Sequence, residues 1–356
     1  MPRFYEQNIE VILEPGSFEK HIKELRFQNN IESAFVLSTP AAREHGVKEI
    51  LEKAGYSPVV MWGEEYGDLT EPTNDQILEA YKDFVISDCD TVIAIGGGSI
   101  VDLGKGVVFN SLADIRPTFI AVPTTYSGAE ITKGLMIVRG PGNKKPVYDE
   151  NCRPDILIID SLLADTLPTT TSLIIAIDAL THCLEGAAST IPHPIAEGAA
   201  IHGINIALQH LPTTEITPEF REAFATVGFL GSKAMDCALG HIHNISFSIG
   251  KQVGLKHGEI NTLFAPAVIE ASMRKRNDAY QFVDVEKLLH VFDFYIKEWD
   301  LYSKYLPKHK DIFMETAIAN ANYNSHPVDL DSEDFKWIFE TTLQRAREHV
   351  ESSRDS

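Results

Sequence analysis

In the first half of the chain, short apolar runs alternate with amphipathic stretches, and this feature most limits the possible folds. Strands that are apolar along their whole length and separated by helices form parallel sheets covered on both faces. The expected strands are residues 11–13, 34–38, 58–61, 91–95, 118–122 and 156–159, and the intervening helices include residues 16–25, 41–54 and 74–85. We therefore predict a doubly wound α/β domain, which binds ligands at the carboxyl ends of its strands.

The pattern changes after Leu167-Pro168, where apolar residues begin to recur at helical spacing. The expected helices are residues 173–188, 194–211, 219–239 and 283–295. A length of 356 residues also suits about two domains. We predict an α/β domain over residues 1–165 and an all-α domain over residues 166–356.

The charge and the cysteine spacing limit the class of partner. The chain has 31 Lys and Arg against 51 Asp and Glu, a net charge of −20 that repels nucleic acids and anionic membranes. Neither a hydrophobic leader nor an unbroken apolar run of about 18 residues occurs. We expect a cytoplasmic protein that acts on small molecules. The four cysteines are too widely spaced for a disulfide framework or a CxxC metal site, so we expect reduced thiols. They are Cys89, Cys152, Cys183 and Cys237.

A glycine-rich turn, Gly96-Gly97-Gly98-Ser99, directly follows the expected strand at residues 91–95 and opens a helix. Glycine lets the backbone approach a phosphate closely, and a helix N-terminus favours anions. Asp102 is expected in the first helical turn, where a carboxylate is favoured. The turn is not GxGxxG, so a simple tight turn is the alternative.

A second polar turn, Thr124-Thr125-Tyr126-Ser127-Gly128, follows the next expected strand. Its hydroxyl groups could hold a ribose or a phosphate, although a Pro-Thr helix cap is an ordinary alternative. Two such turns after successive strands favour a nucleotide site over either turn taken alone.

The helical half contains an acidic residue and several histidines that could bind a metal. Asp178 and His182 share one helix face, and His241, His243 and His257 follow. One Asp with two or three His suits Fe²⁺ or Zn²⁺ and leaves a position open for substrate. Each residue alone could be a surface pair or a buried core histidine, so the prediction of a metal centre depends on the joint pattern.

Taken together, these motifs resemble the iron-containing (group III) alcohol dehydrogenase family. The resemblance covers about residues 12–267 and implies a dinucleotide domain, a helical domain and a divalent metal in the cleft between them. The matching stretches, in the family's order, are residues 96–105, 123–132, 178–185 and His257-Gly258.

The resemblance also implies roles for individual residues. The four metal ligands would be Asp178, His182, His243 and His257, and the interval between the last two favours His243 over His241. Gly97, Gly98 and Ser99 would hold the pyrophosphate, with Asp102 beside them. The nucleotide would be contacted by Thr124, Thr125 and Ser127, with Lys144 near the nicotinamide ribose.

Two departures from the family pattern bear on function. Phe247 stands where many members have a second histidine that relays a proton, so it is a candidate wall of the substrate pocket. Thr39 stands near the position where members that prefer NAD have Asp, so NADP is permitted. Ser38-Thr39-Pro40 and Pro123-Thr124-Thr125-Tyr126 also resemble the maleylacetate reductase branch.

We therefore predict a metal-dependent dehydrogenase or carbonyl reductase that uses NAD or NADP with Fe²⁺ or Zn²⁺. We also expect it to form a homo-oligomer, namely a dimer. One alternative is a dehydroquinate-synthase-like lyase or cyclase, which needs several cations around a phosphate; residues 178–257 are poor in them. A non-catalytic binding protein with the same fold is a third possibility.

Overall fold

The computed structural model describes residues 9–69, 71–111, 116–128, 130–138, 144–191, 193–235, 239–306 and 328–354. The chain forms two compact units. Of the described residues, one unit contains those up to Ser172 together with Ile216–Ser232, and the other contains Leu173–Glu215 and those from Lys233 onward. This division differs from the predicted one at residue 165, because a later segment returns to the first unit.

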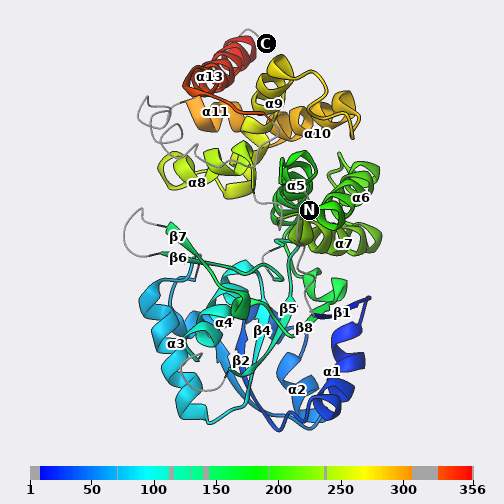
Figure 1. The fold of residues 1–356 in the computed structure, drawn as a ribbon, viewed down its shortest axis with the longest axis vertical. Helices are drawn as coiled ribbons and strands as arrows, with labels where there is room; N and C mark the ends of the chain where they lie inside the picture. Colours follow the sequence, from blue (N-terminus) through cyan, green and yellow to red (C-terminus); the bar gives the residue numbers. More distant parts are fainter. Residues whose placement is uncertain are drawn as a thin grey trace. The chain divides into compact units, whose positions relative to one another are not determined.

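A six-stranded parallel sheet forms the centre of the first unit, in the order β1-β8-β5-β4-β2-β3 (Figure 1). Each strand lies within one or two residues of a predicted apolar run, so the prediction of a doubly wound domain is confirmed. The strands are β1 (Glu10–Leu13), β2 (Ser33–Ser38), β3 (Ser57–Trp62), β4 (Thr91–Gly96), β5 (Thr118–Pro123) and β8 (Ile156–Ile159).

Helices cover both faces of this sheet, as the uninterrupted apolar strands require. Ile93 and Ile95 of β4 pack in one core cluster with Phe18 and Val47 from two helices on that face. On the opposite face, Ala94 lies against Gly104 of α4, where a Cβ would come within 2.9 Å of it. The helices are α1 (Ser17–Gln28), η1 (Pro40–Arg43), α2 (Val47–Lys53), η2 (Gly63–Tyr66), α3 (Asn74–Ser87) and α4 (Gly98–Ser111).

Two details of the first unit were not predicted. The single helix expected over residues 41–54 is interrupted: η1 ends at Arg43, and Gly46, with a φ of +60°, precedes the start of α2. An antiparallel hairpin, β6 (Gly134–Val138) and β7 (Lys144–Tyr148), lies outside the main sheet. Its second strand, Lys-Lys-Pro-Val-Tyr, carries few apolar residues, so the sequence gives it no strand signal. Two short helices follow it: η3 (Glu150–Cys152) and η4 (Ser161–Ala164).

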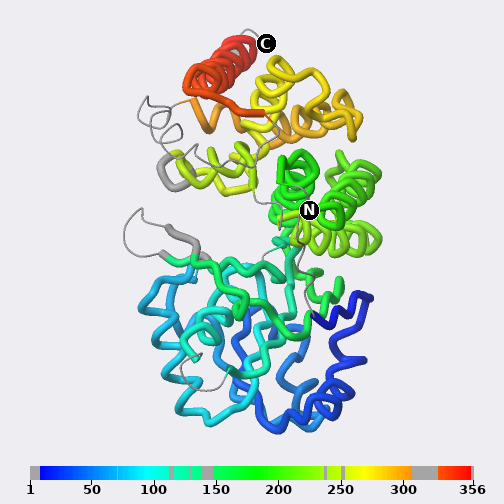
Figure 2. Tube along the Cα trace, viewed as in Figure 1, coloured from blue at the N-terminus to red at the C-terminus, as the bar shows by residue number. Residues whose placement is uncertain are grey.

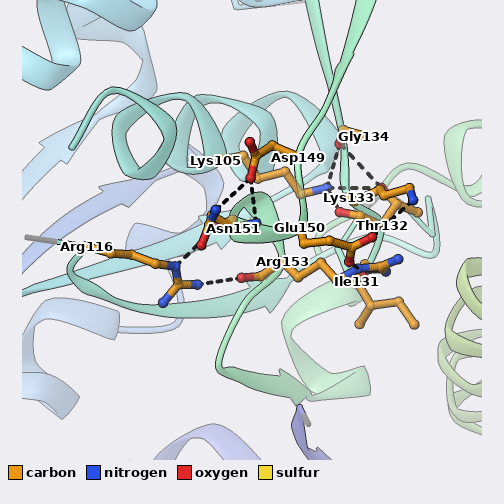
Figure 3. Close-up of polar contacts among 10 residues, drawn as sticks. All are labelled: Lys105, Arg116, Ile131, Thr132, Lys133, Gly134, Asp149, Glu150, Asn151 and Arg153. Carbon is orange, nitrogen blue, oxygen red and sulfur yellow. Dashed lines mark hydrogen bonds and ion pairs between the residues drawn. The ribbon is translucent and has the colours of Figure 1, made fainter. Parts of the chain in front are cut away.

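A buried lysine fixes the segment between β5 and β6. The Lys105 ammonium donates to the Thr132 carbonyl at 2.8 Å, to the Thr132 hydroxyl at 3.0 Å and to the Gly134 carbonyl at 2.8 Å (Figure 3). Arg153 donates to the Ile131 carbonyl and pairs with Glu150. Because Lys105 and Arg153 are buried, their hydrogen bonds to these carbonyl groups hold the segment against α4 and η3.

The second unit consists of helices, as the change of periodicity predicts (Figures 1 and 2). Its first helix, α5, is long and apolar enough by length and composition to cross a membrane, but 83% of that window is buried inside the structure, as in a core helix. The helices are α5 (Thr169–Ala188), α6 (Pro194–His210), α8 (His241–Val253), α9 (His257–Lys275), α10 (Val285–Glu298), α11 (Leu301–Tyr305) and α13 (Ser332–Arg354).

Helix α7 (Pro218–Ala234) accounts for the difference from the predicted division, because most of it belongs to the first unit. Phe220 and Phe224 pack their rings against Tyr126, at centroid distances of 6.5 and 6.1 Å. Gly228 lies against the backbone of Tyr126, where a Cβ would come within 2.8 Å of its carbonyl oxygen. The Ser232 hydroxyl donates to the Gly128 carbonyl. The second polar turn is therefore supported by a helix far along the chain.

Glu130 gives the first unit a pH-dependent stability. Burial raises the pKa of this carboxyl, which is 2% exposed, to about 7, and its Oε2 has no hydrogen-bond partner among the described residues. Because the folded-state pKa of Glu130 is raised, the contribution of this carboxyl to the free energy of unfolding is complete below pH 4.5. That contribution is lost as the pH rises through 7. Glu130→Gln should therefore make the protein about 3 kcal/mol more stable at pH 8 and less than about 1 kcal/mol more stable at pH 5. Urea unfolding at a series of pH values measures this.

The matched control is Glu79→Gln, which removes an exposed carboxylate from α3 and should leave the pH dependence as in the unmodified protein. If the stability of the Glu130→Gln protein depended on pH in the same way as that of the unmodified protein, this carboxyl would not titrate near neutrality in the folded state.

Candidate metal centre and nucleotide-binding turns

The two polar turns predicted after β4 and β5 lie side by side. Gly96 pairs with Pro123 in the sheet, and the Thr124 N–H donates to the Gly96 carbonyl at 3.0 Å. A Cβ on Gly97 would lie only 3.2 Å from the Thr125 methyl group, so the glycine lets the turns pack together. The sequence shows only that the turns follow successive strands. The parallel pairing of β4 with β5 brings them together.

Thr39 lies at the same edge of the sheet. It follows β2, and its N–H donates to the Ile95 carbonyl of β4 at 2.9 Å. The chain leaves β2 toward β3 on one side and leaves β4 toward β5 on the other. The ends of β2 and β4 are therefore the topological switch point, where doubly wound sheets bind ligands.

These turns have the chemistry that a dinucleotide requires. The Thr125 Oγ1 is buried and has no hydrogen-bond partner among the described residues, so it is available to a ligand. Helix α4 begins at Gly98, and its N-terminal dipole favours a phosphate at the turn. Thr124 is buried, and Gly97, Gly98, Ser99 and Ser127 are half-buried at the same two turns.

The position predicted for Asp102 was wrong. It lies one turn further into α4, whose first turn contains no acidic residue, and it is only 7% exposed. Burial lowers the pKa of the Lys105 ammonium, and the nearby Asp102 carboxylate opposes that shift. Asp102 thus stabilises the buried lysine that holds residues 132–134. Lys144 begins β7, and its side chain lies outside the described part of the structure.

In the helical unit, α5 and α8 bring three predicted metal ligands together. One donor atom each from Asp178, His182 and His243 lies within 4.8 Å of the other two. The Asp178 Oδ1 is 3.4 Å from the His243 Nε2, and the His182 and His243 rings stack with centroids 4.5 Å apart. His241 instead packs its ring edge-on against Phe335, so His243 is the histidine of α8 that meets Asp178.

The fourth predicted ligand, His257, is the first residue of α9. Its Nε2 lies 3.6 Å from the Asp178 Oδ1, although it is not within the compact group of three. Gly258 allows this approach, because a Cβ there would come within 2.5 Å of the Ile174 carbonyl oxygen on α5. Phe247, 40% exposed, stacks on the His257 ring at 4.9 Å and so lies beside the cluster.

Two buried polar residues, not assigned a role from the sequence, complete the cluster. The Glu185 carboxylate accepts hydrogen bonds from the Gly240 and Ile242 N–H groups at 2.8 and 2.6 Å, and its Oε2 lies 2.6 Å from the His243 Nδ1. A carboxylate on one imidazole nitrogen leaves the other nitrogen for a metal. The Asn261 amide donates to the Asp178 Oδ1 at 2.7 Å. Helical spacing could have indicated both residues from the sequence. Glu185 follows Asp178 by two helical turns and Asn261 follows His257 by one, so each lies on the same helix face as a predicted ligand.

Burial and the two carboxylates set the protonation states of the cluster. Burial would raise the pKa of Asp178, but the neighbouring imidazoles outweigh it and hold the pKa well below its usual range. Burial lowers the pKa of His182 to about 4, so this ring is neutral and can ligate. Burial also opposes the charge of His243, but Glu185 and Asp178 outweigh it and raise its pKa to about 9, so this ring carries a proton at neutral pH that a bound metal would have to replace.

The donor set passes a simple test of fit to Fe²⁺ or Zn²⁺. It combines a carboxylate with imidazoles, the ligands that both ions take in proteins. The His182 Nδ1 is buried without a hydrogen-bond partner among the described residues, and the Glu185 carboxylate orients the His243 ring. A structural cluster would be expected to satisfy its buried nitrogen internally.

We expect Glu185→Gln to weaken metal binding. The amide would offer one acceptor oxygen where the carboxylate uses two, so the His243 ring would lose its orientation. Loss of such a carboxylate typically costs about 10- to 100-fold in metal affinity. Competition between the protein and a chromophoric chelator for Zn²⁺ measures it.

Glu270→Gln is the matched control. It also removes a carboxylate from an ion pair in this unit, here with Arg345 at 2.8 Å, but this pair does not contact the cluster. It should keep the full Zn²⁺ affinity. Equal Zn²⁺ affinities of the Glu185→Gln and Glu270→Gln proteins would show that Glu185 does not contribute to metal binding.

Comparisons with known proteins agree with this geometry. The chain matches two models, "Iron-containing alcohol dehydrogenase" over residues 8–161 and "Fe-containing alcohol dehydrogenase family, C-terminal" over residues 173–296. It is 26% identical to a 4-hydroxybutyrate dehydrogenase of Cupriavidus necator over 59% of this chain and 63% of that protein. It is 31% identical to maleylacetate reductase 1 of Cupriavidus pinatubonensis over 65% of this chain and 64% of that one. These matches thus span just under two thirds of each relative.

A solved structure matches the fold over a longer range. The iron-containing alcohol dehydrogenase of Thermococcus thioreducens superposes with a TM-score of 0.84 at 19% identity, covering 96% of this chain and all of that one. At that identity the likeness concerns the fold, whereas the two family models describe the sequence of both units. With both units matched in order, this chain belongs to the iron-containing alcohol dehydrogenase family.

Proposed function

We propose that the protein is a metal-dependent, NAD(P)-linked alcohol dehydrogenase that also reduces aldehydes or ketones. The observation that carries the proposal is the cluster of Asp178, His182 and His243, in which a buried carboxylate orients one imidazole. Family membership supports it, as do relatives that are dehydrogenases or reductases.

Each part of the site would have a separate task. The ligands would be Asp178, His182, His243 and His257. When bound, Fe²⁺ or Zn²⁺ would supply a Lewis acid for the substrate oxygen, and the nicotinamide cofactor would supply or accept the hydride. Gly97, Gly98, Ser99, Thr124, Thr125 and Ser127 would hold the cofactor, with Thr39 at its ribose and Lys144 near the nicotinamide.

Phe247 would form an apolar wall beside the ligand His257. Its side chain cannot carry a proton, but it is 40% exposed, so water reaches this position and can take the proton of the alcohol. An apolar wall favours substrates with carbon bulk over the smallest alcohols.

No observation favours the lyase alternative. Both family models that match the chain describe alcohol dehydrogenases, and both relatives reported above are oxidoreductases. We further expect the enzyme to act in the cytoplasm as a homodimer, as the acidic, cysteine-poor sequence and the family resemblance imply.

The direct test is an activity assay with a paired variant. Purified protein supplied with Fe²⁺ or Zn²⁺ should oxidise NADPH or NADH when aldehydes or ketones are added, as followed by nicotinamide absorbance. His182→Ala should lower kcat at least about 100-fold and reduce bound metal, because it removes a ligand. His202→Ala, on the exposed face of α6, should change neither. Full metal content and activity in the His182→Ala protein would contradict the ligand assignment.

The position of Phe247 gives a second test. Phe247→His places an imidazole with an ordinary pKa of about 6.5 beside the cluster, so kcat should acquire a new ionisation near that pH. Phe247→Leu removes the ring without adding a titrating group and should keep the original profile. Identical profiles for the histidine and leucine proteins would mean that residue 247 does not face the reacting oxygen.

A further inference from the structure

An arginine stacked on a tryptophan lies at the edge of the sheet that carries the nucleotide-binding turns. The Arg43 guanidinium carbon is 4.2 Å from the centre of the Trp62 ring, and its Nη2 is 2.6 Å from the Glu64 Oε1. Arg43 ends η1, which begins directly after Thr39. Trp62 pairs with Ser38 in the sheet, so both side chains come from the carboxyl ends of β2 and β3.

This is where a doubly wound domain distinguishes its two nicotinamide cofactors. A carboxylate near the end of the second strand accepts the ribose 2′-hydroxyl of NAD, whereas an arginine there accommodates the 2′-phosphate of NADP. After β2 the sequence reads Ser38-Thr39-Pro40, without a carboxylate. The cation nearest along the chain is Arg43, four residues after Thr39.

We propose that Arg43 binds the 2′-phosphate of NADP(H) and makes this the preferred cofactor; the inference rests on the proposed function. The contact with Trp62 restrains the guanidinium, which can then make two parallel hydrogen bonds to a phosphate. Such preorganisation lowers the cost of ordering a long side chain on binding. Local recognition of this kind is needed because the net charge of −20 does not attract an anion from a distance.

Glu64 is the group that the phosphate would replace. The Arg43 and Glu64 side chains are 43% and 55% exposed, and an exposed ion pair contributes little to stability. A doubly charged phosphate competes well with it for the same guanidinium. The neighbouring Glu65 is already engaged, since its Oε1 accepts the Trp62 N–H at 2.8 Å. Glu64 therefore weakens the preference for NADP(H) without abolishing it.

Two small probes isolate the contribution of the 2′-phosphate without any catalysis. Adenosine 2′,5′-bisphosphate and 5′-AMP differ only in that group, and calorimetric titration of the full chain measures both. The unmodified protein should bind the bisphosphate about tenfold more tightly than 5′-AMP. Arg43→Gln should abolish this preference and leave 5′-AMP binding unchanged, whereas Glu64→Gln should widen it about threefold.

Arg26→Gln is the matched control, because Arg26 also lies over an aromatic ring, that of Phe27, but on α1. It should keep the full preference. Equal binding of the two probes to the unmodified protein, or a preference that survives in Arg43→Gln, would overturn the assignment of Arg43 and leave the nucleotide site standing. If neither adenosine 2′,5′-bisphosphate nor 5′-AMP binds, the result would contradict both the nucleotide site and the proposed function.

Discussion

The buried Glu185 carboxylate is the interaction on which the helical site depends. It lies two turns along α5 from Asp178, accepts the N–H groups at the start of α8 and reaches the His243 Nδ1. One side chain thus caps a helix, joins α5 to α8 and orients the His243 ring. A buried carboxylate without these donors would be costly, so the position of α8 and the state of His243 are fixed together.

The two polar turns proposed to bind the nucleotide depend on support from α7 and from Lys105 of α4. Parallel register places Gly96 beside Pro123, but α7 and Lys105 hold the segment that follows β5. Lys105 belongs to the glycine-turn motif and yet donates to the Thr132 and Gly134 carbonyls, away from Gly97. Part of this motif is therefore structural: its glycines give room for a ligand, and its lysine keeps the neighbouring turn in place.

Much of this arrangement could be predicted because its signals are local. The six parallel strands are largely apolar, and Asp178 and His182 are one helical turn apart. The β6–β7 hairpin was missed because Lys144–Tyr148 is polar and contains a proline, so its pairing comes from its partner strand. The placement of Asp102 in the first turn of α4 was wrong by one turn. Glycine occupies positions 96–98, where the helix begins, so only the structure shows its first residue.

By itself the sequence determined the fold class, the order of the motifs and the residue types available for a metal and a nucleotide, because periodicity and spacing act along the chain. The tertiary structure alone decided which distant groups meet. It brought α7 to Tyr126, Glu185 to His243, and Arg43 to Trp62. Such contacts arise from packing, sheet register and the burial of polar groups, which depend on the whole folded chain and leave no mark in a local stretch of residues.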